Sequence, residues 1–365
     1  MRKVLKNEGV QAFLASLICI LIGLLIGYIV LLFINPAGAG DSTLNVVKNF
    51  LYKKPARQMK ELGNTMAKTM PLILCSLSIL FSYKVGLFNI GAAGQYVAGA
   101  CASLYAALAW GWGWLPCMLF AIVAGALLGS ITGLLKAYCN VNEVISGIML
   151  NWIALYTTNT ILAGVKESTS PYTLYLDKVN KASLLPTVGM HSIFGNNENV
   201  TIAVPLTIIV AIVIWIILSK TRLGYELKAT GNNRNAAKYA GMAQNRNIIL
   251  TLAISGALAG LAASLLYQTG YMRWECTQSS VPSMGFNGIA AAFLGGLHPI
   301  GAIFSSFFIQ HITDGGQYVN TNFYSPQISD VISSVIIYLC GFVLFIKLTM
   351  KKWIAKSEEK KGAKQ

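Results

Sequence analysis

Six polar or aromatic side chains stand inside or at the edges of long apolar runs, where each must find a hydrogen-bond partner or face water. Amides donate and accept hydrogen bonds, and an indole offers an apolar face on which a planar solute can stack. The candidates for a solute pathway are Asn89, Gln95, Glu143, Asn151, Trp152 and Asn287. Other roles stay open: the amides can bond helix to helix, Trp152 can face lipid or core, and Glu143 can be a first-turn carboxylate.

Residue patterns that support catalysis are missing from the sequence. No G-x-x-x-x-G-K-[ST] motif occurs, so the chain is not expected to cradle ATP by a P-loop. His191, His298 and His311 lack the H-E-x-x-H spacing, and we expect a capping or interface role for His311 and Asp314. The seven cysteines show no C-x-x-C spacing. The sequence therefore predicts a transport subunit rather than an enzyme, with no metal or cofactor bound by this chain.

The composition places the chain in a lipid bilayer. Of its 365 residues, 55% are hydrophobic and only 11% are charged, and the mean hydropathy is +0.59. Soluble domains carry about 25% charged residues. The net charge of +15 has a simple explanation in basic residues that flank membrane spans, so no nucleic-acid partner is expected.

The apolar runs predict one all-α polytopic membrane domain, residues 1–365, with about ten transmembrane helices. Hydropathy and helix breakers place the spans at residues 10–34, 66–83, 86–109, 114–135, 143–164, 201–219, 248–268, 284–297, 299–313 and 327–347. The eighth and ninth are short and meet at His298-Pro299, so a broken or re-entrant pair is an alternative to two full crossings.

Charge and loop length organise the domain further. Residues 1–64 are expected to form an anchor span and an external loop, residues 65–347 the core of the membrane domain, and residues 348–365 a basic cytoplasmic tail. Most basic residues then lie on the side of both termini, which the positive-inside rule assigns to the cytoplasm. The external stretches 35–64 and 165–199 either dock an external partner or only connect spans.

Glycines cluster in two of the apolar regions. Glycine lets a helix unwind at membrane depth or approach another helix closely, and plain helix packing is the alternative to a role in transport. The positions are Gly86, Gly91, Gly94, Gly285, Gly288, Gly295 and Gly296. Phe88-Asn89 and Phe286-Asn287 form a weak internal echo in spans of opposite direction, which suggests an inverted repeat.

The polar segment 220–247 is too long for a tight turn, and it predicts a short helix over residues 234–241 that begins after an Asn cap. Small residues at spacings of one, three and four leave one helix face nearly bare. That face either docks a soluble partner or packs on its own bundle. The segment's candidate docking residues are Gly231, Asn232, Asn233, Arg234, Ala236, Ala237, Tyr239, Ala240 and Gly241.

Three motifs in this order resemble one transporter family. The run G-N-N-R-N-A-A-K-Y-A-G-M at 231–242 is similar to the coupling loop of ABC importer permeases of the ribose and branched-chain amino acid group. The run G-L-F-N-I-G-A-A-G-Q at 86–95 resembles the signature of the nucleoside-type permeases in that group. G-F-N-G-I-A at 285–290, with Gly295-Gly296 and His298-Pro299, is similar to their later motif.

The resemblance implies a permease subunit of an ATP-driven nucleoside importer in the bacterial plasma membrane. It further implies a second, related permease as heterodimer partner, an ATPase with two cassettes that binds ATP and Mg²⁺, and an extracellular substrate-binding lipoprotein. In that setting the amides would hydrogen-bond a nucleobase edge or a ribose hydroxyl, and Trp152 would stack on the base.

Two alternatives to a nucleoside importer stay open. A ribose-type sugar permease shares the same permease group. An ion-coupled secondary transporter requires buried ionisable residues, and the apolar runs offer only Glu143, Asp314 and Asp330, all near span ends.

Overall fold

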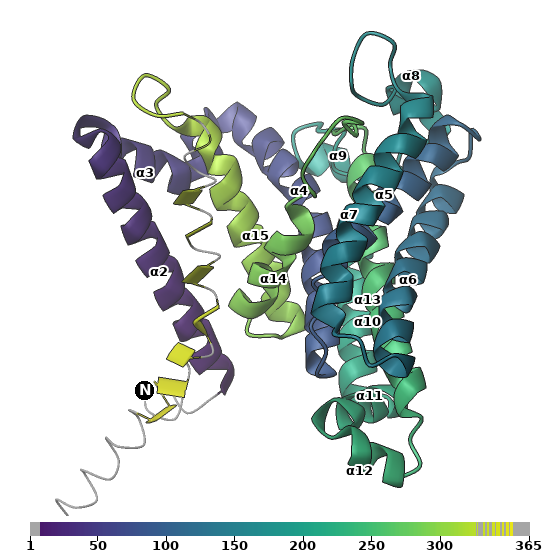
Figure 1. Ribbon diagram of the computed structural model, residues 1–365. Coiled ribbons are helices and arrows are strands. Elements are labelled where there is room, and N and C mark those ends of the chain that lie inside the picture. Colours follow the sequence, from purple (N-terminus) through teal and green to yellow (C-terminus); the bar gives the residue numbers. More distant parts are fainter. Residues whose placement is uncertain are drawn as a thin grey trace, which may run out of the picture. The chain divides into compact units, whose positions relative to one another are not determined.

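The computed structural model describes residues 8–325 and, beyond them, residues 327, 331–332, 334–335, 338–339, 341–343, 345–346, 348–349 and 351–352 (Figure 1). The chain divides into two compact units. Unit 1 combines Met1–Lys54 with Ala290–Gln365, and unit 2 is Pro55–Ile289. Within the described residues the fold is helical, and the only strand-like pairing is two isolated β-bridges, Lys166 with Thr173 and Tyr172 with Glu275.

Unit 2 is built around two buried helices, α4 (Pro55–Lys84) and α13 (Gln244–Tyr267), whose most apolar stretches are 89% and 72% buried. Around them pack α5 (Ala92–Leu108), α6 (Trp114–Tyr138) and α10 (Ala203–Lys220), and α7 (Glu143–Leu162) packs on α5 and α6. The first part of α14 (Met284–Leu294) also belongs to this unit. A helix buried all round must be apolar all round, which explains the uniform hydrophobicity of α13.

The interface between α6 and α13 is made by glycines at four-residue spacing. A Cβ atom on Gly129 would overlap the carbonyl of Leu252, and one on Gly256 would overlap the carbonyl of Gly125. A Cβ atom on Gly260 would overlap the carbonyl of Ala121. The two backbones therefore touch directly, as in small-residue packing of membrane helices.

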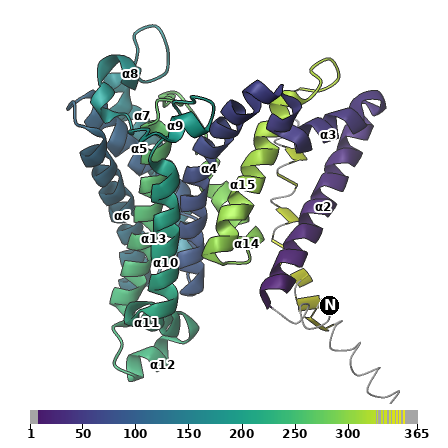
Figure 2. The same ribbon diagram turned by 180° about the vertical axis from the view of Figure 1, so that it is seen from behind.

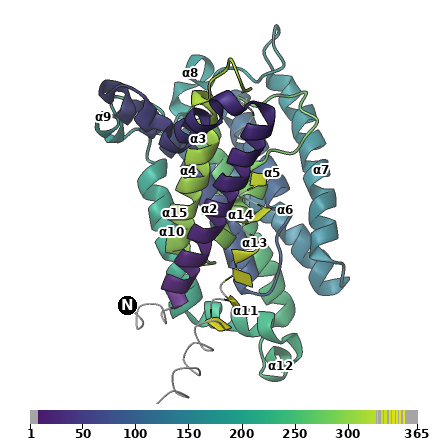
Figure 3. The same ribbon diagram turned by 90° about the vertical axis from the view of Figure 1, so that its left-hand side faces the viewer.

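The two ends of unit 2 differ in construction (Figure 3). At one end lie α11 (Arg222–Asn232) and α12 (Arg234–Tyr239), beyond the ends of α10 and α13. At the other end the chain is mostly irregular and contains two short helices, α8 (Leu176–Val179) and α9 (Met190–Ile193). This irregular chain is pinned by the fully buried Trp274, whose indole N–H donates to the Oδ1 atom of Asn159 at 2.9 Å.

Unit 1 holds α2 (Glu8–Ile34), η1 (Pro36–Gly38), α3 (Ala39–Lys48), η2 (Asn49–Tyr52), the end of α14, α15 (Pro299–Gly315) and η5 (Gly316–Tyr318) (Figure 2). Asn49 joins η2 to α15, because its side-chain amide donates to the backbone carbonyl of His311 at 2.8 Å. The Nε2 atom of His311 lies 2.8 Å from the carbonyl of Val47. His311 thus has the interface role that the sequence predicts.

Several span predictions need adjustment. Among the described residues, six helices are long and apolar enough to cross a membrane, namely Leu14–Ile34, Arg57–Lys84, Trp114–Tyr138, Glu143–Val165, Ala203–Lys220 and Gln244–Tyr267. The predicted external loop 35–64 is wrong as a loop, because it contains α3 and the first ten residues of α4. Of the predicted span 327–347, only scattered residues are described, and most of the tail 348–365 lies outside the described residues.

Candidate translocation and coupling site

The chain between α4 and α5 leaves the helical path at Gly86. Gly86 has φ of +77°, a left-handed conformation that L side chains avoid, and the carbonyl of Ser82 accepts from the N–H of both Val85 and Leu87. Residues 87–89 have no regular secondary structure, and α5 begins at Ala92. The predicted span 86–109 therefore starts with a non-helical segment, residues 86–91, which we call the helix break.

Asn89 and Gln95 bond to each other across the helix break. The Asn89 amide N–H donates to the Oε1 atom of Gln95 at 2.8 Å and to the Oγ atom of Ser255 at 2.7 Å. Gln95 donates back to the Oδ1 atom of Asn89 at 3.2 Å, and Ser255 donates to the carbonyl of Ser78 on α4 at 2.7 Å. Asn89 is only 2% exposed. In this conformation the two amides hold the break in place and offer little hydrogen-bonding capacity to a solute.

Asn151 of α7 satisfies the backbone on either side of the α5 N-terminus. Its Oδ1 atom accepts from the N–H of Gly94 at 2.7 Å, and its amide donates to the carbonyl of Ile90 at 3.1 Å. Gly94 must lack a side chain here, because a Cβ atom would lie 2.6 Å from the Asn151 Oδ1 atom. One turn earlier on α7, Gly147 must also lack a side chain, because a Cβ atom there would lie 2.9 Å from the backbone N of Gly91. The sequence did not single out this glycine. The amide of Asn151 is therefore a cap for the helix break.

Trp152 points away from that buried face. It is 42% exposed, and its ring stacks on that of Tyr156, which is 56% exposed, with ring centroids 6.1 Å apart and planes 23° apart. The stack lies on one face of α7, and the i, i+4 spacing in the sequence was the signal that could have identified Tyr156. Of the predicted pathway residues, Trp152 is the one with an exposed aromatic surface.

Asn287 and the glycines beside it lie on α14. A Cβ atom on Gly285 would lie 2.7 Å from the backbone N of Ala93, and one on Gly288 would lie 2.8 Å from the Cβ of Cys75. These two glycines therefore permit close approach to α5 and α4 and do not interrupt α14. Asn287 is half-buried, and its side chain makes no hydrogen bond to the described residues.

Gly295 and Gly296 follow the end of α14 and form the turn into α15. Gly296 has φ of +66° and Leu297 has φ of +54°. A Cβ atom on Gly295 would lie 2.6 Å from the backbone N of Ala302. The structure thus has a broken helix pair at His298-Pro299, where the His298 side chain caps the N–H of Ile300 at 3.3 Å.

Glu143 lies at the start of α7 and is neutralised locally. Its Oε2 atom is 2.7 Å from the Nζ atom of Lys136, the last basic residue of α6. Glu143 is therefore a first-turn carboxylate that links the end of α6 to the start of α7.

The predicted short helix exists as α12, and its cap is the predicted one. The Asn233 Oδ1 atom accepts from the N–H of Ala236 at 3.0 Å. The bare face is divided, however. Ala237 is 3% exposed and packs inward, because α11, which the sequence reasoning did not foresee, covers that side. The exposed face carries Ala236, Ala240 and Gly241, with Tyr239 93% exposed beside them.

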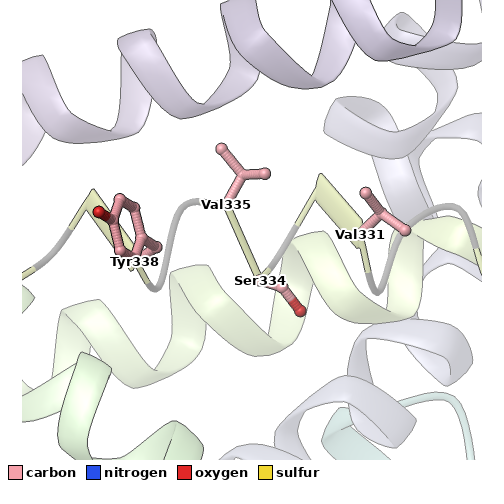
Figure 4. Close-up of a pocket in the computed structure, with 4 residues that line it drawn as sticks. All are labelled: Val331, Ser334, Val335 and Tyr338. Carbon is pink, nitrogen blue, oxygen red and sulfur yellow. The ribbon is translucent and has the colours of Figure 1, made fainter.

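Two cavities of about 410 Å³ occur in the described part of the chain. One lies beside α12, between the first turns of α11 and α13, and is lined by Arg222, Leu223, Glu226, Gly241, Ala243, Arg246, Asn247 and Leu250. The other lies in unit 1 and is lined by Val331, Ser334, Val335 and Tyr338 (Figure 4). None of the predicted pathway residues borders either cavity.

The described residues form neither a metal-ligand cluster nor a disulfide. No group of three or more His, Cys, Asp or Glu side chains is placed to hold a metal ion. The six described cysteines are free: Cys19, Cys75, Cys101, Cys117, Cys139 and Cys276.

Comparison with known proteins gives a consistent answer. Residues 62–341 match the family described as the permease component of branched-chain amino acid transport systems. The nucleoside ABC transporter permease NupB of Lactococcus lactis is 33% identical over 98% of this chain and all of its own length. The guanosine ABC transporter permease NupP of Bacillus subtilis is 31% identical, covering 96% of this chain and 97% of its own. The glucose ABC transporter permease TsgB13 of Haloferax volcanii is 29% identical, covering 76% of this chain and 74% of its own.

No solved structure matches the chain. Members of this family are transport subunits that work with an ATPase and a substrate-binding partner, and they are not enzymes. With six candidate spans and a family match over most of its length, the chain belongs to the permease family of the branched-chain amino acid transport systems, as a multi-pass membrane subunit of an ABC importer.

Proposed function

We propose that this chain is one of two related permeases of an ATP-driven importer that translocates nucleosides. The observation that carries the proposal is the identity of 33% and 31%, over nearly the whole chain, to relatives named for nucleoside and guanosine transport. Relatives named for sugars cover less of the chain, 76% for the glucose permease and 49% for the D-allose permease. A sugar is therefore the second candidate substrate.

The stacked pair Trp152 and Tyr156 supports a planar substrate. Its exposed rings offer the apolar face that a nucleobase stacks on, and the unbonded amide of Asn287 offers a donor and an acceptor for a base edge or a ribose hydroxyl. A sugar can also pack its C–H groups on such rings, so the identity to nucleoside permeases is what favours the nucleoside.

The partner set follows from the same relatives. Lactococcus lactis and Bacillus subtilis each have two different nucleoside or guanosine permeases similar to this chain, which supports a heterodimer. The ATPase has two cassettes and binds the ATP and Mg²⁺. It docks on the exposed face of α12. An extracellular lipoprotein delivers the substrate at the opposite end, where α8 and α9 lie.

Orientation rests on charge. The end of unit 2 that carries α12 is rich in basic residues, which belong on the cytoplasmic side. They include Lys84, Lys136, Lys220, Arg222, Lys228, Arg234, Lys238 and Arg246. We place both termini in the cytoplasm and keep about ten crossings with an inverted repeat as the topology.

The function is tested in proteoliposomes that hold both permeases and the ATPase, with the binding protein added outside and ATP enclosed. Labelled guanosine is expected to accumulate when ATP is enclosed, to stay outside without it, and to enter equally well with a protonophore. An excess of ribose is expected not to compete. Uptake that needs a proton gradient would contradict the importer, and competition by ribose would favour the sugar alternative.

Replacing Trp152 by alanine is expected to lower the rate of guanosine import about tenfold, because stacking of a base on an aromatic ring contributes about 1–3 kcal/mol. Trp152→Phe keeps a ring and should retain most of the rate. Ile153→Ala is the matched control, since Ile153 is the next exposed residue on the same helix. Equal losses in Trp152→Ala and Ile153→Ala, measured as initial import rates, would remove Trp152 from the pathway.

A further inference from the structure

Two glycines bring the chain that leads into α12 against the start of the helix break. A Cβ atom on Gly231 would overlap the carbonyl of Val85 and lie 2.9 Å from the backbone N of Gly86. A Cβ atom on Gly86 would lie 2.7 Å from the carbonyl oxygen of Gly231. We call this pair the glycine contact. No side chain separates the two backbones, so one cannot shift toward the other without displacing it.

Gly231 moves with α12. It is the second-last residue of α11, and two residues later Asn233 caps α12. The preceding residue, Thr230, is held to α13 because its Oγ1 atom accepts from the Asn247 amide at 2.9 Å. Ala237 is packed inward, so α12 is fixed to the same body. A force on the exposed face of α12 is therefore transmitted to Gly231 through only a few ordered residues.

Gly86 begins the helix break. Leu87, the next residue, is 2% exposed and packs against Ile248 and Leu252 of α13. Asn89 follows two residues later, with its bonds to Gln95 and Ser255. The glycine contact thus connects the α11–α12 segment to Asn89, whose hydrogen bonds hold the helix break in place.

The other end of the break is held by α7. Asn151 of that helix accepts from the Gly94 N–H and donates to the Ile90 carbonyl. The glycine contact and the Asn151 cap therefore act on opposite ends of the same short segment. Contiguous packed elements of this kind can carry coupling between distant sites.

We propose that the glycine contact transmits movement of the ATPase-docking helix α12 to the helix break, so that Gly231 and Gly86 are positioning residues for transport. The proposal rests on the proposed docking of the ATPase at α12. Pressure on α12 shifts Gly231 against Gly86, and the Asn89–Gln95 pair opens or closes as the break moves. Packed elements of this kind switch between discrete arrangements rather than deform continuously.

The test measures molecules of guanosine imported per ATP hydrolysed in reconstituted full complexes. Gly231→Ala adds one methyl group at the contact, and the assembled complex is expected to hydrolyse ATP while its import per ATP falls about tenfold. Gly129→Ala is the matched control, because its Cβ atom would overlap the backbone carbonyl of Leu252 at the α6–α13 interface, as the Gly231 Cβ atom overlaps that of Val85. A ratio that is unchanged in Gly231→Ala overturns the proposal.

A second variant tests the contact without a clash. Thr230→Val removes the hydroxyl that accepts from Asn247 and keeps the side-chain shape, so α11 is loosened beside Gly231. Import per ATP is expected to fall about fivefold, and an unchanged ratio in this variant also overturns the proposal. Loss of ATPase binding in α12 variants, together with normal coupling in Gly231→Ala and Thr230→Val, would refute the glycine contact and leave the proposed function intact.

Discussion

Replacing Ala240 by tryptophan is expected to abolish co-purification of the ATPase and to stop transport, while the permease remains in the membrane at normal abundance. Ala240 is exposed at the end of α12, on the same face as Ala236, so an indole there holds the partner's surface away. Disruption at the centre of an interface costs about 2–4 kcal/mol or more, which lowers binding at least about thirtyfold. The measurement is ATPase recovered with tagged permease from detergent.

Two further variants make this result interpretable. Ala163→Trp places the same bulk on an exposed alanine at the far end of α7, and ATPase recovery should be unchanged. Ala237→Trp is a poor choice, because Ala237 is buried and the indole would disrupt α12 itself. Full recovery of the ATPase with Ala240→Trp would show that α12 is not the docking helix.

Replacing Asn151 by leucine is expected to reduce transport more than tenfold and to lower the temperature at which the purified permease unfolds. Leucine fills the space but leaves the Gly94 N–H and the Ile90 carbonyl without their partner. Each buried unsatisfied group costs about 1–3 kcal/mol. Thr157→Leu on the exposed face of α7 is the control and should change neither property. A stable and fully active Asn151→Leu variant would contradict the role of Asn151 as a cap.

Local features of the fold were predictable from the sequence. The Asn233 cap, the short helix after it and the departure from helix at Gly86 are each determined by a few neighbouring residues. Turn and cap chemistry acts over three or four positions, so its signal is complete within the motif. The same is true of the turn at Gly296, where His298 and Pro299 start the next helix.

Long-range pairings were not predictable in the same way. Asn89 bonds to Ser255, 166 positions later, and nothing in either local sequence specifies the other. The amides of Asn89 and Asn151 were predicted to be candidates for substrate contact, with helix-to-helix bonding as the alternative, and the structure has them bonded internally. Their contribution to the pathway remains a proposal that depends on the break opening. The inward side of Ala237 was missed because α11 is largely polar, and of its residues only Gly224, Leu227 and Thr230 are buried.

The glycine interface between α6 and α13 limits which parts of unit 2 can slide. Because carbonyls meet Cα atoms without intervening side chains at Gly125, Gly129, Gly256 and Gly260, there is no layer of flexible rotamers to absorb a displacement. We expect α6 and α13 to move together as one rigid body, with the α11–α12 segment attached at its end. Gating is then confined to the other seams of unit 2, and a cysteine cross-link between α6 and α13 should leave transport unimpaired.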